Sequence, residues 1–119
     1  MKIIIKTKNF ELTGFLERFI NDKIGKLEKF AKTLGKDSME IFVEVEKETN
    51  HHRKGDLFIA HLQIQLPGKN LMAKAHGEDL QKAIIDAKDE LEIEIKKHKL
   101  KVIELPRRKI RKEMGKEIF

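Results

Sequence analysis

Every long apolar segment of this chain has a single apolar face, and this property limits the possible folds more than any other. In residues 2–8, 39–47, 58–66 and 71–75 apolar and polar residues alternate. This alternation predicts half-buried β-strands, because successive side chains of a strand point to opposite faces of the sheet. The side chains expected to face inward are Ile3, Ile5, Thr7, Met39, Ile41, Val43, Val45, Phe58, Ala60, Leu62, Ile64, Leu66, Leu71, Ala73 and Ala75. A sheet built from such strands has one face that must be covered.

Two further segments carry apolar residues at helical spacing. Thr13 is the expected N-cap of a first helix that reaches about Leu34, and Gly35 follows it as a C-cap signal. The second helix is expected from about Glu78 to Lys99, with acids at its start and lysines at its end, as the helix dipole favours. The apolar stripes are Leu16, Ile20, Ile24, Leu27, Ala31 and Leu34 in the first helix, and Leu80, Ala83, Ile84, Ala87, Leu91, Ile95 and His98 in the second.

The order of these elements is β-α-β-β-β-α. The polar segment 48–56 is expected to be a loop, and Pro67-Gly68 a turn. The first β-α-β connection is long enough for a right-handed crossover between parallel strands, and the later strands can follow as antiparallel hairpins. We therefore predict a two-layer α+β sandwich, with two helices packed on one face of a four-stranded sheet. Residues 1–99 would form this single domain, and residues 100–119 a basic C-terminal tail.

The positive charge of the chain is concentrated near its C-terminal end. The formal net charge is +6, whereas residues 96–112 alone carry nine basic residues and one acid, a net charge of +8. The residues before this segment and those after it each have a net charge of −1. This asymmetry points to a polyanionic partner.

The sequence contains no constellation of groups suited to catalysis. It lacks a P-loop, a Gly-rich dinucleotide turn and a nucleophile elbow, and its only serine, Ser38, is expected at the start of a strand. His51 and His52 are adjacent, so their side chains point apart in an extended loop. His61 and His76 on the outer sheet face could pair only if the strand register allowed it. We expect no enzymatic activity, no cofactor, no metal site and no small-molecule substrate.

The cellular compartment is indicated by what the sequence lacks. No run approaches the roughly 18 apolar residues that a membrane-spanning helix needs. The N-terminal residues MKIIIKTK contain too few apolar residues for the core of a signal peptide, and there is no cysteine. We therefore expect a cytoplasmic protein without a membrane partner.

Basic side chains outside the apolar stripes are the best candidates for a binding site. Those on the first helix are Arg18, Lys23, Lys26, Lys29 and Lys32, and those on the second are Lys82, Lys88, Lys96 and Lys97. Lys23 falls near the edge of the stripe and would have to snorkel. Such lysines could merely solubilise the helices, but the basic run 96–112 favours a nucleic acid. Tyrosine and tryptophan are absent, which argues against stacking on single-stranded bases and favours folded RNA recognised through its backbone.

Four segments carry a family resemblance when taken together. They are IKTKNFELT (5–13), KIGKLEKF (23–30), VEVEKETNHHRKGDLFIAHLQIQLPGKNLMAKA (43–75) and GEDLQKAIIDAKDELEIEIKKHK (77–99). In this order and spacing the chain resembles the ribosome hibernation-promoting factors, also called ribosome-associated inhibitor or protein Y. The resemblance implies the β-α-β-β-β-α fold and binding to the small ribosomal subunit between its head and body. There the protein would block mRNA and tRNA and silence translation in starvation or stationary phase.

The resemblance also implies which residues contact rRNA. It assigns this role to Lys23, Lys26 and Lys29 on the first helix, and to Lys96, Lys97 and Lys99 on the second. With the basic residues near them and in the tail, the full predicted RNA-binding set is Lys23, Lys26, Lys29, Lys82, Lys88, Lys96, Lys97, Lys99, Lys101, Arg107, Arg108, Lys109, Arg111 and Lys112. Long family members carry a second, dimerising domain, so the chain resembles a short form and is expected to be a monomer.

The sequence departs from many relatives in its second helix. Gln81 stands where many have tyrosine, and Glu90 and Ile93 stand where many have basic residues. We expect residues 100–112 to supply the positive charge that this helix lacks. Two alternatives stay open: a general structured-RNA-binding module similar to a double-stranded RNA-binding domain, and a regulatory domain that binds a partner through the outward Ile85 and Ile93.

Overall fold

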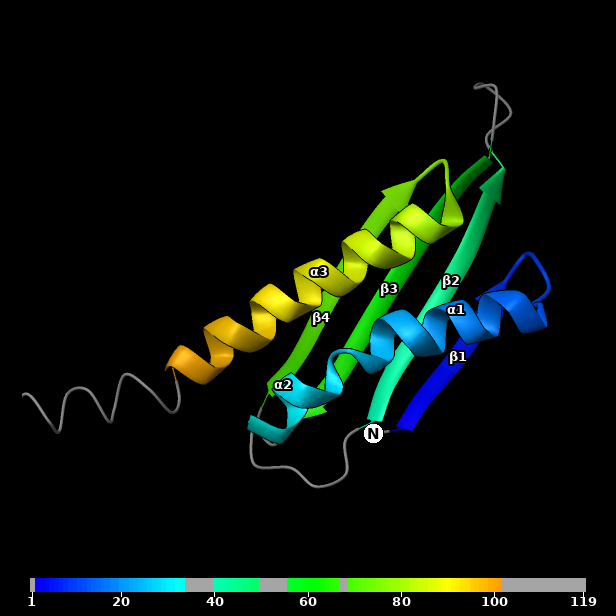
Figure 1. The fold of residues 1–119 in the computed structure, drawn as a ribbon. Coiled ribbons are helices and arrows are strands. Elements are labelled where there is room, and N and C mark those ends of the chain that lie inside the picture. The colour runs from blue at the N-terminus through cyan, green and yellow to red at the C-terminus, as the bar shows by residue number, and fades with distance from the viewer. Residues whose placement is uncertain (1, 34–39, 50–55, 67–68, 102–119) are drawn as a thin grey trace, which may run out of the picture.

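The computed structural model describes residues 2–33, 40–49, 56–66 and 69–101 of the chain. Its elements, in chain order, are β1 (Lys2–Lys8), α1 (Gly14–Gly25), α2 (Glu28–Thr33), β2 (Glu40–Thr49), β3 (Asp56–Leu66), β4 (Lys69–Gly77) and α3 (Leu80–Lys99). The helices lie side by side over one face of the sheet, which gives two layers (Figure 1). The predicted α+β class and element order are therefore confirmed.

The four strands lie in the sheet in the order β1-β2-β3-β4. β1 pairs with β2 in parallel, with Ile3 opposite Ile41, whereas β2–β3 and β3–β4 are antiparallel. The parallel pair requires a crossover between β1 and β2, and α1 and α2 provide it. The two hairpins need only short connections, as predicted from the sequence.

The core lies between the sheet and the helices and consists of side chains that the alternation and the helical stripes select. Its fully buried larger side chains are Ile20, Ile24, Leu27, Ile41, Val43, Val45, Leu62, Ile64, Leu71, Ile84, Leu91 and Ile95. Among the described residues no polar or charged side chain is buried. Met39, Ala31 and Leu34 were also expected inside, but their side chains are outside the described part of the chain.

The first predicted helix is wrong in one respect, because it is broken into α1 and α2 at Lys26 and Leu27. Around this break the N–H of Leu27 donates to the carbonyl of Ile24, and the N–H of Phe30 to that of Leu27, each at 3.0 Å. Both bonds span three residues, as in a 3₁₀ turn. Gly25 precedes the break and is a poor helix former, which explains why the regular helix ends there. Leu27 is buried, so the apolar pattern continues through the break and hides it in the sequence.

Element ends differ from the prediction at three further points. β2 extends to Thr49 and β3 begins at Asp56, so both strands run into the predicted loop 48–56. α3 begins at Leu80 rather than Glu78, because Asp79 has an extended backbone and its carboxylate accepts from the N–H of Gln81 at 3.0 Å. The predicted Gly35 cap and Pro67-Gly68 turn lie outside the described residues.

The predicted N-cap of α1 is confirmed. The hydroxyl oxygen of Thr13 accepts from the N–H of Leu16 at 3.1 Å, and the backbone of Thr13 is extended. None of the helices in the described ranges is long and apolar enough to cross a lipid bilayer.

Candidate nucleic-acid interface

Lysines gather where the helices end. Lys23 lies in the last turn of α1, and Lys96 and Lys97 lie in the last turn of α3. α1, α2 and α3 run in the same general direction; α2 and α3 end toward the same side of the helical layer, and α1 ends partway along it (Figure 1). The carbonyl groups at a helix C-terminus carry a partial negative charge that stabilises nearby cations. This end of the molecule is therefore suited to hold several lysines together.

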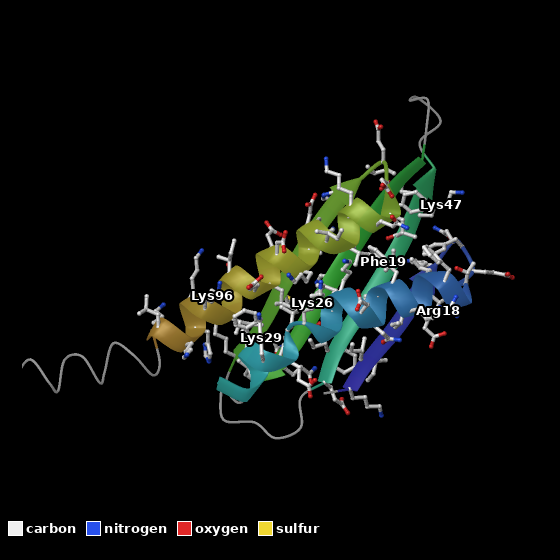
Figure 2. The ribbon with its side chains drawn as sticks, viewed as in Figure 1. Arg18, Phe19, Lys26, Lys29, Lys47 and Lys96 are labelled. Carbon is white, nitrogen blue, oxygen red and sulfur yellow. The ribbon has the colours of Figure 1, made fainter. Side chains whose placement is uncertain are left out.

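Lys96 lies near two further lysines in the view of Figure 2: Lys26, which follows α1, and Lys29 of α2. All three are exposed, and we call them the lysine cluster. The Lys29 ammonium lies 5.1 Å and the Lys96 ammonium 5.2 Å from the centroid of the Phe30 ring. Both distances are within the range of a cation–π interaction. Phe30 itself is half-buried and packs against the core. One ring thus brings an ammonium group from α3 close to one from α2.

Lys23 snorkels as expected. Its side chain is 31% exposed, and its ammonium lies 5.7 Å from the centroid of the Phe19 ring and 3.9 Å from the Asp22 carboxylate. The aliphatic part is covered while the charge reaches the surface. Lys23 therefore adds to the positive charge of the helix face next to the lysine cluster.

Two other lysines of α3, Lys82 and Lys88, do not belong to the lysine cluster. The Lys88 side chain is only 18% exposed, and its ammonium lies 3.3 Å from Asp89 and 3.5 Å from Glu92. Lys82 is exposed, but it precedes Lys96 by 14 residues, roughly 21 Å along the helix. The structure therefore does not bring Lys82 or Lys88 to the lysine cluster.

At the C-terminal end of α3 the lysines have weak local partners. Lys96 lies 3.4 Å from Glu92 and Lys97 lies 3.6 Å from Glu94; both lysine side chains are exposed, although the Glu92 side chain is only 21% exposed. Exposed pairs of this kind contribute about 0–1 kcal/mol, so a phosphate can replace the carboxylate at small cost. Lys99 is half-buried and Lys101 is exposed. The other predicted residues, Arg107, Arg108, Lys109, Arg111 and Lys112, lie outside the described part of the chain.

The sheet face away from the helices is balanced in charge. Lys6 of β1 is the register partner of Glu44 on β2, and Lys8 that of Glu46. His61 is opposite Lys74 and His76 is opposite Ile59, so the two histidines are not register partners. Within the described ranges no three His, Asp or Glu side chains could hold a metal ion together. The end of the helical layer that carries the lysine cluster is thus a better candidate for a polyanion than the sheet face.

Sequence reasoning missed the role of the two aromatic rings. Phe19 precedes Lys23 by four residues and Phe30 follows Lys29 directly, so both stand at short spacing from a lysine. The first spacing places two side chains on one helix face and could have indicated the contact. The approach of Lys96 to Phe30 could not have been read from the sequence, because it depends on how α2 and α3 pack.

Comparison with known proteins places the chain in a family. Residues 3–103 match the family described as Sigma 54 modulation protein / S30EA ribosomal protein. The chain belongs to this family. It is 30% identical over 102 residues to the ribosome hibernation promoting factor of Klebsiella oxytoca, and the match covers 86% of this chain and 97% of that protein.

A second relative is longer. The ribosome hibernation promotion factor of Lactococcus lactis is 28% identical over 109 residues, which cover 90% of this chain but 54% of that protein. The chain thus spans about half the length of this relative. Neither these two names nor the family description is that of an enzyme, in agreement with the prediction of a non-enzymatic binding protein.

Two solved structures share the fold. A ribosomal subunit interface protein from Coxiella burnetii superposes with a TM-score of 0.66 at 18% identity, covering 83% of this chain and 98% of that one. The N-terminal domain of Thermus thermophilus Protein Y superposes with a TM-score of 0.63 at 23% identity, covering 82% and 99%. At these identities the likeness concerns the fold alone.

Proposed function

We propose that the chain is a ribosome hibernation factor that acts in the cytoplasm. The names of its relatives in Klebsiella oxytoca and Lactococcus lactis support hibernation as the process. The observation that carries the proposal for this chain is the lysine cluster, in which Lys29 and Lys96 converge on the Phe30 ring. Closely spaced ammonium groups on one surface match the charge density of an RNA backbone.

The proposed mechanism is steric exclusion. The domain would bind the small ribosomal subunit in the decoding channel, anchored by contacts between the lysine cluster and rRNA phosphates. Its body would then occupy the space that mRNA and tRNA need, and translation would be silenced under starvation or in stationary phase. The chain would act as a monomer.

Competition on purified small subunits tests this mechanism. The full chain is expected to sediment with the subunits, and increasing salt should release it, because phosphate contacts are salt-dependent. Bound tRNA and mRNA should block binding, whereas naked duplex RNA should compete poorly. If duplex RNA competes as well as tRNA does, the chain is instead a general structured-RNA-binding module.

A further inference from the structure

A hollow of about 550 Å³ is lined in part by the first residues of α1 and α3. These helix starts lie at the opposite end of the helical layer from Lys29 and Lys96 of the lysine cluster (Figure 2). Residues from the segment between β1 and α1, from β2 and β3, and from the starts of α1 and α3 line the hollow. Its apolar wall consists of Phe10, Phe15, Leu16, Phe58 and Leu80. Its volume falls within the range of roughly 300–1,000 Å³ that is usual for binding sites.

The wall of this hollow is held by contacts between distant segments. The rings of Phe10 and Phe58 meet edge to face, with centroids 6.2 Å apart. Asn9 has a positive φ of 66°, and its side-chain amide donates to the carbonyl of Lys47 at 3.3 Å. This left-handed residue turns the chain after β1, and its amide ties the turn to β2. The hollow is therefore a built feature of the fold.

Phe15 at the border of the hollow is 62% exposed, the highest value among the large exposed apolar side chains of the described residues. Burying such a side chain is favourable, because it removes apolar surface from water. Exposed aromatic residues beside an apolar pocket are frequent anchors of protein–protein contacts. Phe15 thus offers apolar surface that the described part of the chain leaves largely uncovered.

Among the charged side chains that line the hollow, acids outnumber bases. Its lining includes the three carboxylates of Glu11, Glu78 and Asp79 and one ammonium group, that of Lys47. Within the described ranges neither Glu11 nor Glu78 forms an ion pair. A negative rim repels phosphates and attracts lysine or arginine. RNA is therefore a poor occupant, and an apolar segment that carries positive charge is a good one.

We propose that this hollow docks a basic, apolar segment of a protein of the small ribosomal subunit. Phe15 would pack against an apolar side chain of the segment, while Glu11 and Glu78 pair with its lysines or arginines. The inference rests on the proposed function, because the partner must be part of the ribosome. Since the lysine cluster is at the other end of the helices, the protein could hold rRNA and this segment at the same time.

Site-specific photo-crosslinking tests the partner directly. The full chain with p-benzoylphenylalanine in place of Phe15 is bound to purified small subunits and irradiated. We expect a crosslink to a ribosomal protein, within a segment rich in lysine or arginine. A crosslink to rRNA alone, or none while the chain still sediments with the subunits, would overturn the inference. If the unaltered chain does not sediment with the subunits at all, the proposed function fails and the inference fails with it.

Affinity measurements provide a second test. Phe15→Ser and Glu78→Lys should each weaken binding to small subunits about tenfold, the loss of one anchor contact. Phe15→Ser should leave the salt dependence and the affinity for deproteinised rRNA unchanged. The matched control is Met72→Ser, since Met72 is 55% exposed but lies on β4 and not at the hollow. Unchanged subunit affinity in both variants, or an equal loss in the control, would contradict the proposal.

Discussion

The ammonium group of Lys96 on α3 lies 5.2 Å from the centroid of the Phe30 ring on α2. Lys29 approaches the same ring at 5.1 Å, so two positive charges from different helices share one aromatic ring. Their mutual repulsion is offset by the ring and by Glu92, which lies 3.4 Å from Lys96. The lysine cluster is therefore a product of tertiary packing, and it should respond to changes in the ring as well as in the lysines.

Reversing the charge of the cluster should release the protein from the ribosome. In Lys29→Glu and Lys96→Glu we expect small-subunit affinity to fall by about tenfold or more, because each variant loses a phosphate contact and adds repulsion. Charge removal in Lys29→Ala should lower the salt slope of binding by roughly one unit. The measurement is sedimentation at several salt concentrations. Lys82→Glu is the matched control, and an equal loss there would show that only total charge matters.

Replacing the ring should weaken RNA binding without removing a charge. Phe30→Leu keeps an apolar side chain in the core but loses the cation–π contacts of both lysines. We expect a loss of about 0.5–2 kcal/mol in small-subunit binding, since the lysines are no longer held together. Phe42→Leu, on the β2 face away from the helices, is the control for general loss of aromatic packing. Comparable affinity for the two variants would contradict a positioning role for Phe30.

Replacing Gly25, which precedes the break between α1 and α2, should stabilise the domain. A Cβ atom at Gly25 would meet no other heavy atom within 4 Å, so Gly25→Ala fits without strain. Alanine favours helix over glycine by about 0.8–1.0 kcal/mol, and we expect the thermal midpoint to rise by a few degrees. Circular dichroism during heating measures the change. A lower midpoint would mean that the turn at Lys26 and Leu27 needs the freedom of glycine.

The predicted C-terminal tail, residues 100–119, should strengthen binding to small subunits through its positive charge. Truncation after Leu100 removes Lys101 and the five predicted basic residues between Arg107 and Lys112. We expect weaker binding to small subunits and a smaller salt slope, because fewer phosphates are contacted. A full-length variant with those six residues changed to glutamine separates charge from length. Affinity and slope equal to those of the unaltered chain would contradict this prediction.

The sequence predicts the elements well where one local signal decides them. The alternation in Ile41, Val43 and Val45 and the hydroxyl of Thr13 each determine structure within a few residues, and both predictions were confirmed. The break at Lys26 was missed because Leu27 keeps the helical pattern. The meeting of Lys96 with Phe30 was missed because it joins residues far apart in the chain, and no local pattern encodes that approach.

The parallel pairing of β1 with β2 has a consequence for how the domain opens. β1 pairs with one strand only, and this partner strand begins at Glu40, beyond both α1 and α2. The strands β2, β3 and β4 each pair with the strand that follows or precedes them in the chain, so these three can assemble without β1. β1 must therefore close the longest loop in the sheet, and its amide protons should exchange with solvent before those of β3. The N-terminal strand, although part of the sheet, is where unfolding of the sheet should begin.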